Sequence, residues 1–266
     1  MMFTRNSLAV LAVAVVALAA PTARADILLP NVDFILNLRN FDMGTPYSMD
    51  NPPVKGPSPT GAKSNEDGWG IFKVTAITDT SANVLWADGQ DGMELTGVFY
   101  GLQDLSAVWD PIDLEWTIKS ENLKMDIWHN PHGSFVPGLG PDGRGVEASQ
   151  YQGITDVGGT LILSAETRAP GVYGLPEFQS TVNVAGYGDF RAWADVTGGT
   201  QAANFNTNSQ LGGTDLYLSS DLFPGTVDEW MFESSDPVRG RFVPEPFSLG
   251  LLGIGAVALL RRRRRA

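Results

Sequence analysis

Apolar and polar residues alternate in short runs along most of the chain, and this alternation predicts β-strands. The clearest run covers residues 69–78, where Phe72, Val74 and Ala76 would share one face of a strand. Because Pro30 interrupts an earlier run at 26–40, we expect that strand at a sheet edge. Further strands are expected at 83–87, 93–100, 106–109, 112–118, 123–128, 160–164, 181–185, 190–196, 214–218, 227–232 and 238–242.

The segments between these runs are rich in turn-forming residues. The chain holds 30 glycines and 17 prolines, and the stretches 41–67 and 129–150 are expected to be long loops. Short helices near 102–107 or at Ala165 fit the pattern, but no longer helical period occurs between the terminal segments. These features predict an all-β fold, with one β-sandwich or jelly-roll-like domain of roughly ten to twelve strands over residues 26–242.

The first 25 residues have the features of a secretory signal peptide. Arg5 supplies a positive start, residues 8–20 are apolar, and residues 23–25 (Ala-Arg-Ala) provide the small residues of a cleavage site. The apolar run is too short to span a bilayer, which takes about 20 residues. The sequence therefore predicts export, with a mature chain that begins at Asp26.

The last 24 residues contain three parts in order. The first is a short extended segment, because proline lacks an N–H and restricts the residue before it; it consists of Val243, Pro244, Glu245 and Pro246. The uncharged run from Phe247 to Leu260 follows, and as a helix it would reach roughly 21 Å, less than a hydrocarbon core of about 30 Å. The third part is a basic cluster that favours the cytoplasmic side and would stop transfer: Arg261, Arg262, Arg263, Arg264 and Arg265.

Pro-Glu-Pro, a short hydrophobic segment and a terminal arginine cluster, in this order at the C-terminus, resemble the PEP-CTERM sorting signal. The resemblance is confined to residues 243–266. It implies that the general secretion machinery exports the protein and that an exosortase-type enzyme recognises the tail in the inner membrane and removes it. It also implies a final location at the cell surface or outside the cell, with extracellular polysaccharide or biofilm as the setting. An ordinary C-terminal anchor is the alternative.

Charge limits the partners of the body. The chain has 30 acidic and 18 basic residues, and seven of the basic ones lie in the two terminal segments. Residues 26–246 therefore carry a net charge near −19, which repels nucleic acid and anionic membranes and attracts divalent cations. The chain has no cysteine, which excludes disulfides, thiolate metal sites and thiol nucleophiles.

Both histidines lie in one stretch. His129 and His132, with Asp126 nearby, could ligate zinc or another transition metal. The alternative is a strand end followed by a polar loop, which Pro131 favours. The sequence has no His-Glu-x-x-His metalloprotease motif and no Gly-x-Ser-x-Gly nucleophile elbow, so it assigns no catalytic residue.

Calcium is a second candidate ligand, because it takes carboxylate oxygens from loops. Asp88, Asp91 and Glu94 surround a glycine-rich turn, and Glu66 with Asp67 forms a second acidic group beside a glycine. Neither group follows the EF-hand pattern, and aspartate with glycine is also common in hairpin turns. The sequence therefore predicts no required cofactor and leaves calcium open.

Carboxylates beside aromatic residues could also serve a glycosidase. Asp110, Asp113 and Glu115 lie close to Trp109 and Trp116 in the sequence, and aromatic rings stack on sugars. The alternative places these acids on the solvent face of strands whose other face holds the tryptophans. Most of the seven tryptophans are expected in the core, with one or two available to polysaccharide.

These observations together predict a non-catalytic, exported cell-surface or extracellular-matrix protein, processed at its tail and associated with exopolysaccharide. The alternative is an exported carbohydrate-active enzyme on a β-sandwich scaffold.

Overall fold

The structure is a computed structural model, and it describes residues 29–63, 65–172, 174–227, 229–235 and 237–243. The predicted signal peptide and the tail from Pro244 onward lie outside the described residues, so Val243 alone represents the sorting segment. Among the described residues, no helix combines the length and the apolar character that crossing a membrane requires.

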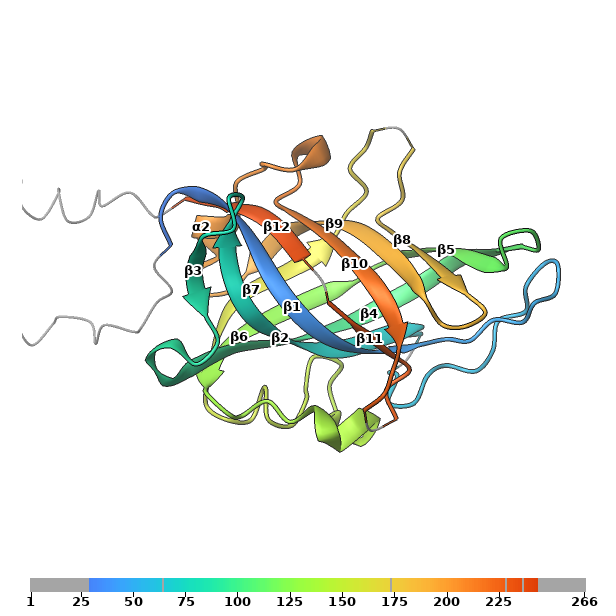
Figure 1. Cartoon of the computed structure of the whole chain (residues 1–266), viewed down its shortest axis with the longest axis horizontal. Helices are drawn as coiled ribbons and strands as arrows, with labels where there is room; N and C mark the ends of the chain where they lie inside the picture. Colours follow the sequence, from blue (N-terminus) through green and yellow to red (C-terminus); the bar gives the residue numbers. More distant parts are fainter. Residues whose placement is uncertain (1–28, 64, 173, 228, 236, 244–266) are drawn as a thin grey trace, which may run out of the picture.

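Nearly all of the regular secondary structure in the described body is β-strand (Figure 1). The strands are β1 (Val32–Gly44), β2 (Gly68–Asp79), β3 (Val84–Ala87), β4 (Met93–Asp110), β5 (Glu115–Glu121), β6 (Lys124–Pro131), β7 (Thr160–Thr167), β8 (Phe178–Asn183), β9 (Gly188–Gly198), β10 (Leu216–Pro224), β11 (Phe232–Ser234) and β12 (Pro237–Phe242). The short helices are η1 (Gln90–Gly92), η2 (Pro137–Gly143), α2 (Ala202–Phe205) and η3 (Leu211–Gly213).

All strands belong to one antiparallel sheet whose pairing closes on itself. The ring runs from β12 through β1, β2, β4, β5, β8, β9 and β10 back to β12. β6 and β7 form a second connection between β4 and β9. The all-β prediction is confirmed, but the predicted sandwich of two packed sheets is replaced by one sheet closed into a barrel, which needs no second sheet to cover its core.

The first strand begins and ends later along the chain, and lies more centrally in the sheet, than its sequence indicated. β1 pairs with β2 on one side and with β12 and β11 on the other, so it is no edge strand. It also continues to Gly44, into the stretch expected to be a loop. Residues 102–107, a candidate helix, instead lie within β4, and Ala165 lies within β7.

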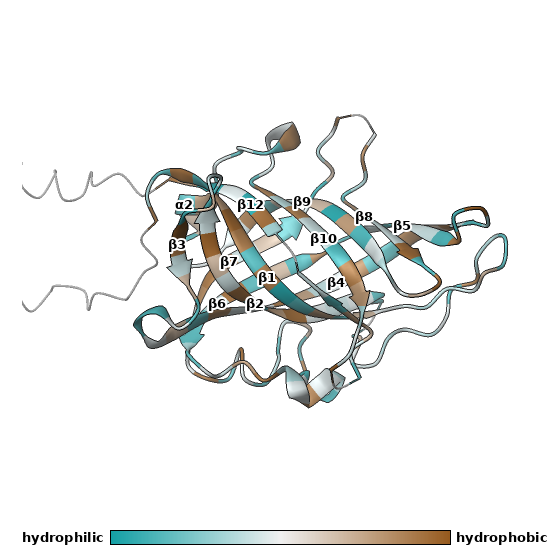
Figure 2. Ribbon diagram, viewed as in Figure 1, coloured by the Kyte–Doolittle hydropathy of each residue, from teal (hydrophilic) through white to brown (hydrophobic). Residues whose placement is uncertain are grey.

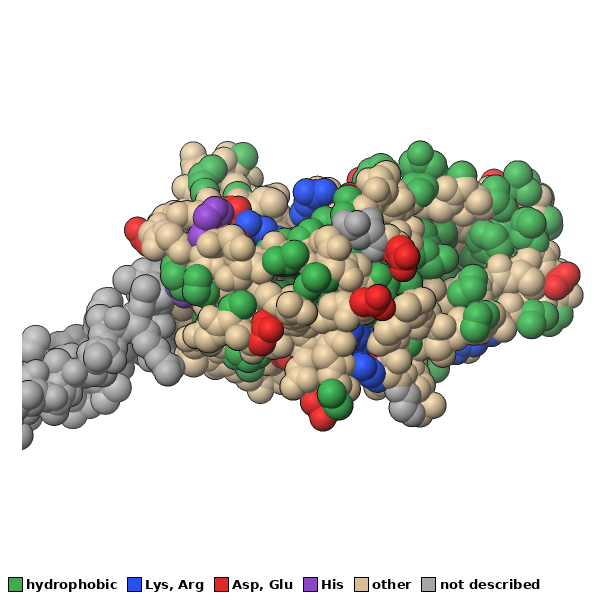
Figure 3. Space-filling model, turned by 90° about the horizontal axis from the view of Figure 1, so that it is seen from below, with side chains coloured by type: hydrophobic (Ala, Val, Ile, Leu, Met, Phe, Trp, Pro, Cys, Tyr) green, Lys and Arg blue, Asp and Glu red, His purple; other side chains and the backbone are tan. Residues whose placement is uncertain are grey.

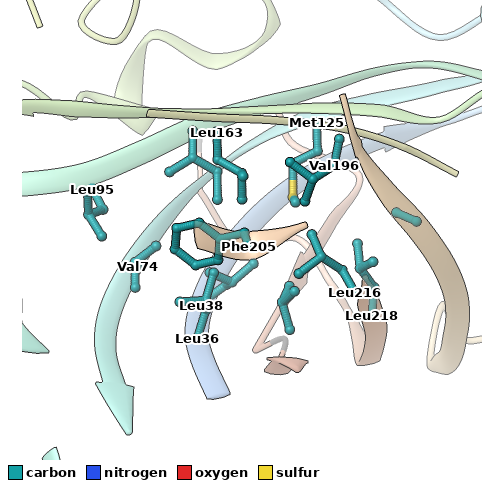
Figure 4. Packing of buried hydrophobic residues seen from close by; sticks show 14 of the residues in the cluster. Leu36, Leu38, Val74, Leu95, Met125, Leu163, Val196, Phe205, Leu216 and Leu218 are labelled. Atoms are coloured by element: carbon teal, nitrogen blue, oxygen red, sulfur yellow. The ribbon is translucent and has the colours of Figure 1, made fainter. Parts of the chain in front are cut away.

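The barrel interior is an apolar core, and α2 covers one end of it. Phe205 of α2 points among Leu36, Leu38 and Val74 (Figure 4), and its ring lies edge-on to Phe34 with centroids 5.4 Å apart. Val243, at the end of the described chain, donates a 2.8 Å hydrogen bond from its N–H to the carbonyl of Asn204. The chain therefore leaves the barrel at the end that α2 closes.

A second apolar cluster lies on the outer face of the barrel. Residues 132–155, including η2, run across the outside of the sheet, where Tyr151 and Ile154 cover Phe41 and Trp69. Figure 2 shows how hydrophobic and hydrophilic residues alternate along the strands beneath. Because this segment covers the outer face locally, some strands are buried on both faces and lose the simple in–out alternation.

Candidate functional site

A cavity of about 440 Å³ lies inside the barrel, and its lining reaches the C-terminal ends of β1, β8 and β10. These strand ends lie at the end of the barrel away from α2 (Figure 1). Val184 and Met231 contribute to its lining and are substantially exposed, so the cavity opens to solvent at that end. A volume of this order and mainly apolar walls are typical of sites for small molecules. The apolar lining includes Leu38, Phe72, Phe99, Leu102, Leu123, Met125, Phe178, Leu218 and Val238.

Two glycines make room for aromatic rings in the cavity wall. In the register of β2 and β4, Gly97 faces Phe72, and Gly70 faces Phe99. A Cβ atom on either glycine would overlap the phenyl ring opposite. Each ring therefore lies over a glycine of the neighbouring strand, and the space in the centre of the barrel stays open.

The polar part of the lining includes two residues of β1. Asn40 and Asp42 are both buried, at 4% and 7% exposure, and both line the cavity. The Ser234 hydroxyl donates a 3.3 Å hydrogen bond to Oδ2 of Asp42. Oδ1 of Asp42 and Oδ1 of Asn40 have no partner among the described residues. Burial raises the pKa of Asp42 to about 8, and the Ser234 hydrogen bond opposes this increase only in part.

A second polar group lies on the β4 and β5 side of the cavity. The Tyr47 and Ser120 hydroxyls donate hydrogen bonds of 2.8 and 2.7 Å to the two carboxylate oxygens of Asp104. Burial raises the pKa of Asp104 and that of Tyr47, whose phenol also faces the Asp104 charge. Asp67 accepts from Lys55 at 2.5 Å and from the Asp104 N–H at 2.8 Å. Unlike Oδ1 of Asn40 and Oδ1 of Asp42, both oxygens of the Asp104 and Asp67 carboxylates have hydrogen-bond partners within the protein.

Apolar side chains also gather on the surface around this end of the barrel (Figure 3). Leu114 and Val184 are both about half exposed and are joined by a 3.2 Å backbone hydrogen bond. Phe223 and Tyr187 are partly exposed and touch edge to face. An exposed apolar rim around an apolar cavity is typical of a ligand entrance.

Three residues nominated from the sequence come together elsewhere. Ligand atoms of Asp88, Glu94 and His132 lie within 4.8 Å of one another, because β4 pairs with β6 from Met93 opposite Pro131. The group contains two residues of the calcium hypothesis, Asp88 and Glu94, and one of the zinc hypothesis, His132, which the sequence had placed at separate sites. Asp91 is exposed on η1, and His129 pairs opposite Leu95 within the sheet; neither belongs to the cluster.

A lysine already forms ion pairs with both acids of this cluster. Lys73 Nζ is 2.8 Å from Asp88 Oδ2 and 2.9 Å from Glu94 Oε2. Burial lowers the pKa of Lys73, but hydrogen bonds to the two acids outweigh that effect and raise it. Glu94 also accepts backbone N–H bonds from Gly133 and Phe135. The arrangement forms an ion-pair cluster that fixes the start of the 132–155 segment.

Two of the other nominated acids, Asp110 and Glu66, have structural partners. Asp110 Oδ1 accepts from the N–H groups of Ile112 and Asp113, which builds the β4–β5 turn. Glu66 forms a buried ion pair with Arg144, at 2.7 Å from Nη1 to Oε2. Two tryptophans, Trp69 and Trp116, are among the residues that line the cavity, and the Trp116 ring lies beside that of Trp109 with centroids 4.5 Å apart.

Sequence reasoning missed Asn40 and Asp42 because it ended the first strand at Asn40. The signal was present, since Leu36, Leu38, Asn40 and Asp42 occupy alternate positions. Extending the alternation through two polar residues would have placed them on the core face.

The comparisons with known proteins give little guidance. No family model and no curated protein matches the chain. Two solved structures are weakly similar. The Diels–Alderase AbmU from Streptomyces koyangensis has a TM-score of 0.23 and 11% identity over 92% of this chain and 84% of its own. A nonspecific heme-binding cyclase that catalyses [4 + 2] cycloaddition during neoabyssomicin biosynthesis has a TM-score of 0.21 and 12% identity over 92% of this chain and 79% of its own. Similarities this weak support no inference about function.

Proposed function

We propose that the chain is an exported protein of the cell surface or extracellular space whose barrel binds a small, largely apolar molecule. The observation that carries the binding proposal is the 440 Å³ cavity with its wall of leucine, phenylalanine, methionine and valine side chains. Burial of a ligand's apolar surface in such a cavity contributes about 25 cal/mol for each Å² removed from water. The exposed apolar rim gives such a ligand a route into the cavity.

The positions of the chain ends fit this role. The cavity opens near the C-terminal ends of β8 and β10, whereas Val243, the last described residue, bonds to Asn204 of α2 at the other end of the barrel. Any attachment through residues after Val243 would therefore leave the mouth facing away from the point of attachment. We infer that the ligand enters from the side away from the attached end.

Export and tail processing remain part of the proposal, and they rest on residues 1–25 and 243–266. We propose that the secretion machinery exports the chain and that an exosortase-type enzyme cuts near Pro244–Pro246. Intact mass and cell fractionation of the protein, with Pro244 and Pro246 changed to alanine as the comparison, test this part. A mature form that starts near Asp26 and lacks the arginines, and that is lost in the variant, is expected. An arginine-tailed form in the inner membrane in both cases would contradict it.

The carbohydrate-active enzyme is the weaker candidate. A glycosidase needs two carboxyl groups that face the substrate, about 5 to 10 Å apart. Asp104 and Asp67 line the cavity, but the hydroxyl, ammonium and backbone groups described above already bind their oxygens. Most of the remaining cavity wall is apolar, whereas sugars require many hydrogen-bonding groups. We therefore favour an apolar ligand over a polysaccharide in this cavity.

A fluorescence titration tests the cavity directly. N-Phenyl-1-naphthylamine brightens in apolar surroundings and can be titrated into the full chain and into Ser180→Phe, whose new ring would fill part of the cavity. The matched control is Ser81→Phe, on an exposed turn. We expect the affinity to fall about tenfold or more in the cavity variant only, a loss of about 1.4 kcal/mol. Equal binding by all three proteins would show that the probe binds elsewhere.

A further inference from the structure

The cavity has one polar position that the protein itself leaves unsatisfied. We propose that Asn40 and Asp42 bind the hydroxyl group of an otherwise apolar, neutral ligand. This inference rests on the proposed ligand cavity and names the chemical class of its occupant. Long-chain or polycyclic alcohols would belong to this class, whereas hydrocarbons and ethers would not.

The geometry of β1 brings the two side chains to the same place. Asn40 and Asp42 are two residues apart on one strand, so their side chains leave the same face of the sheet. Each is more than nine-tenths buried, each lines the cavity, and each has a side-chain oxygen without a partner among the described residues. Buried polar atoms are nearly always hydrogen-bonded, so two unpartnered oxygens on neighbouring residues of a cavity wall point to a missing donor.

The contrast with Asp104 locates the polar end of the ligand. Tyr47 and Ser120 already donate to both oxygens of that carboxyl group, so it has little capacity left for a ligand. Among the described side chains that line the cavity, the buried oxygens without a partner are Oδ1 of Asn40 and Oδ1 of Asp42, both on β1. Leu38 precedes Asn40 on the same face of β1 and belongs to the core beyond the polar pair. A bound alcohol would thus place its hydroxyl at Asn40 and Asp42, with its apolar part against the core residues.

A neutral ligand is favoured over a charged one. Burial raises the pKa of Asp42 to about 8, so at neutral pH the carboxyl group is mostly protonated. A protonated carboxyl group both donates and accepts a hydrogen bond, and the amide oxygen of Asn40 accepts one. A hydroxyl group, which also donates and accepts, complements this pair without placing a charge in the apolar cavity.

The test compares two ligands that differ only in the donor. Decan-1-ol and 1-methoxynonane have the same number of heavy atoms, but the ether has no O–H. Each is used to displace N-phenyl-1-naphthylamine from the full-length wild type, from Asn40→Leu and from Asp42→Leu. Gln201→Leu is the matched control, because Gln201 is also a buried amide but is not among the residues that line the cavity. We expect the ratio of ether to alcohol dissociation constants to fall about tenfold in Asn40→Leu and in Asp42→Leu and to stay unchanged in the control.

The outcomes separate this inference from the proposed function. One outcome is that both ligands displace the probe with the same ratio of ether to alcohol dissociation constants in all four proteins. In that case the cavity binds apolar molecules, but Asn40 and Asp42 do not bind the hydroxyl group, and this inference is wrong. If neither ligand displaces the probe from the wild type, the proposed function itself fails. The Asn40 and Asp42 variants are independent, so loss of folding in one leaves the other as the test.

Discussion

Gly97 of β4 lies directly opposite Phe72 of β2, and the absence of a side chain on the glycine lets the phenyl ring lie over it. The same arrangement occurs two residues away, with Gly70 opposite Phe99. All four positions lie beside the cavity or in its wall. Glycine at positions 70 and 97 therefore helps to determine the shape of the cavity, because the phenyl rings lie against the sheet and leave the barrel centre open.

Replacement of Gly97 by alanine should destabilise the fold and narrow the cavity. The added Cβ would collide with the Phe72 ring and with the carbonyl oxygen of Asp126, so the ring must move inward. Overpacking of this kind costs about 1–3 kcal/mol, which urea denaturation can measure. Gly198→Ala is the control, because the nearest atom to a Cβ there is 3.7 Å away. Equal stability of the two variants would contradict this account of the wall.

Asp42→Asn should change how stability depends on pH. The pKa of Asp42 is about 8 in the folded protein and 3.8 in its ordinary state, so between these values the folded protein holds a proton that the unfolded chain has lost. This residue's contribution to the free energy of unfolding is therefore fully present below about pH 4 and is lost as the pH rises toward 8. Asp42→Asn has no carboxyl group to ionise at this position, so its free energy of unfolding does not decrease for this reason.

Urea denaturation at pH 4.5, 6 and 8 checks this prediction. Relative to the wild type, Asp42→Asn should become progressively more stable as the pH increases, by a few kcal/mol at most. Asp113→Asn, on the exposed β4–β5 turn, is the control and should follow the wild type. A wild type that gains stability relative to Asp42→Asn as the pH rises would show that Asp42 is ionised when folded.

The Arg144–Glu66 pair should be worth far more than a surface ion pair. Both side chains are almost completely buried, two N–H···O bonds of 2.7 and 2.8 Å join them, and the guanidinium lies over the Trp69 ring at 4.2 Å. Arg144→Met leaves a buried carboxylate without its partner, which costs about 3–5 kcal/mol in similar cases. The partly exposed pair Arg168–Asp195 provides the control, since Arg168→Met should cost about 1 kcal/mol or less. Chemical denaturation of both variants distinguishes the two environments.

The Asp88, Glu94 and His132 cluster should bind no divalent cation while Lys73 is present. We expect the Tm of the wild type to stay the same with millimolar calcium or with a chelator, because the ammonium group lies between the two acids. In Lys73→Gln the acids repel each other, so the Tm should fall and calcium should restore part of the loss. A calcium-dependent increase of Tm in the wild type would show that the metal displaces the lysine.

Much of the strand content could be predicted from local alternation. The run at 69–78 corresponds to β2 (Gly68–Asp79), and the segment at 83–87 contains β3 (Val84–Ala87). The closure of the barrel could not be predicted, because it depends on pairings such as β12 with β1, whose strands are about 200 residues apart. The alternation of apolar and polar residues within either strand does not indicate which strand it pairs with.

The candidate sites were predictable only in part, for the same reason. Asp88, Glu94 and His132 were all nominated from the sequence, but only the pairing of β4 with β6 unites them. Lys73 could not be recognised as their counter-ion, because it comes from β2. Asp42 was missed because polar residues on the core face of a strand resemble the start of a loop.

Nuclear magnetic resonance of the tryptophan indole N–H groups tests the cavity proposal most directly. Trp116 lines the cavity and donates to the Ser48 carbonyl, whereas Trp230 lies in the outer cluster and donates to the Pro137 carbonyl. On titration with decan-1-ol, the Trp116 signal, assigned with Trp116→Phe, should shift with saturation while the Trp230 signal stays in place. A Trp116 signal that does not move, or a saturable shift at Trp230 alone, would contradict a ligand site inside the barrel.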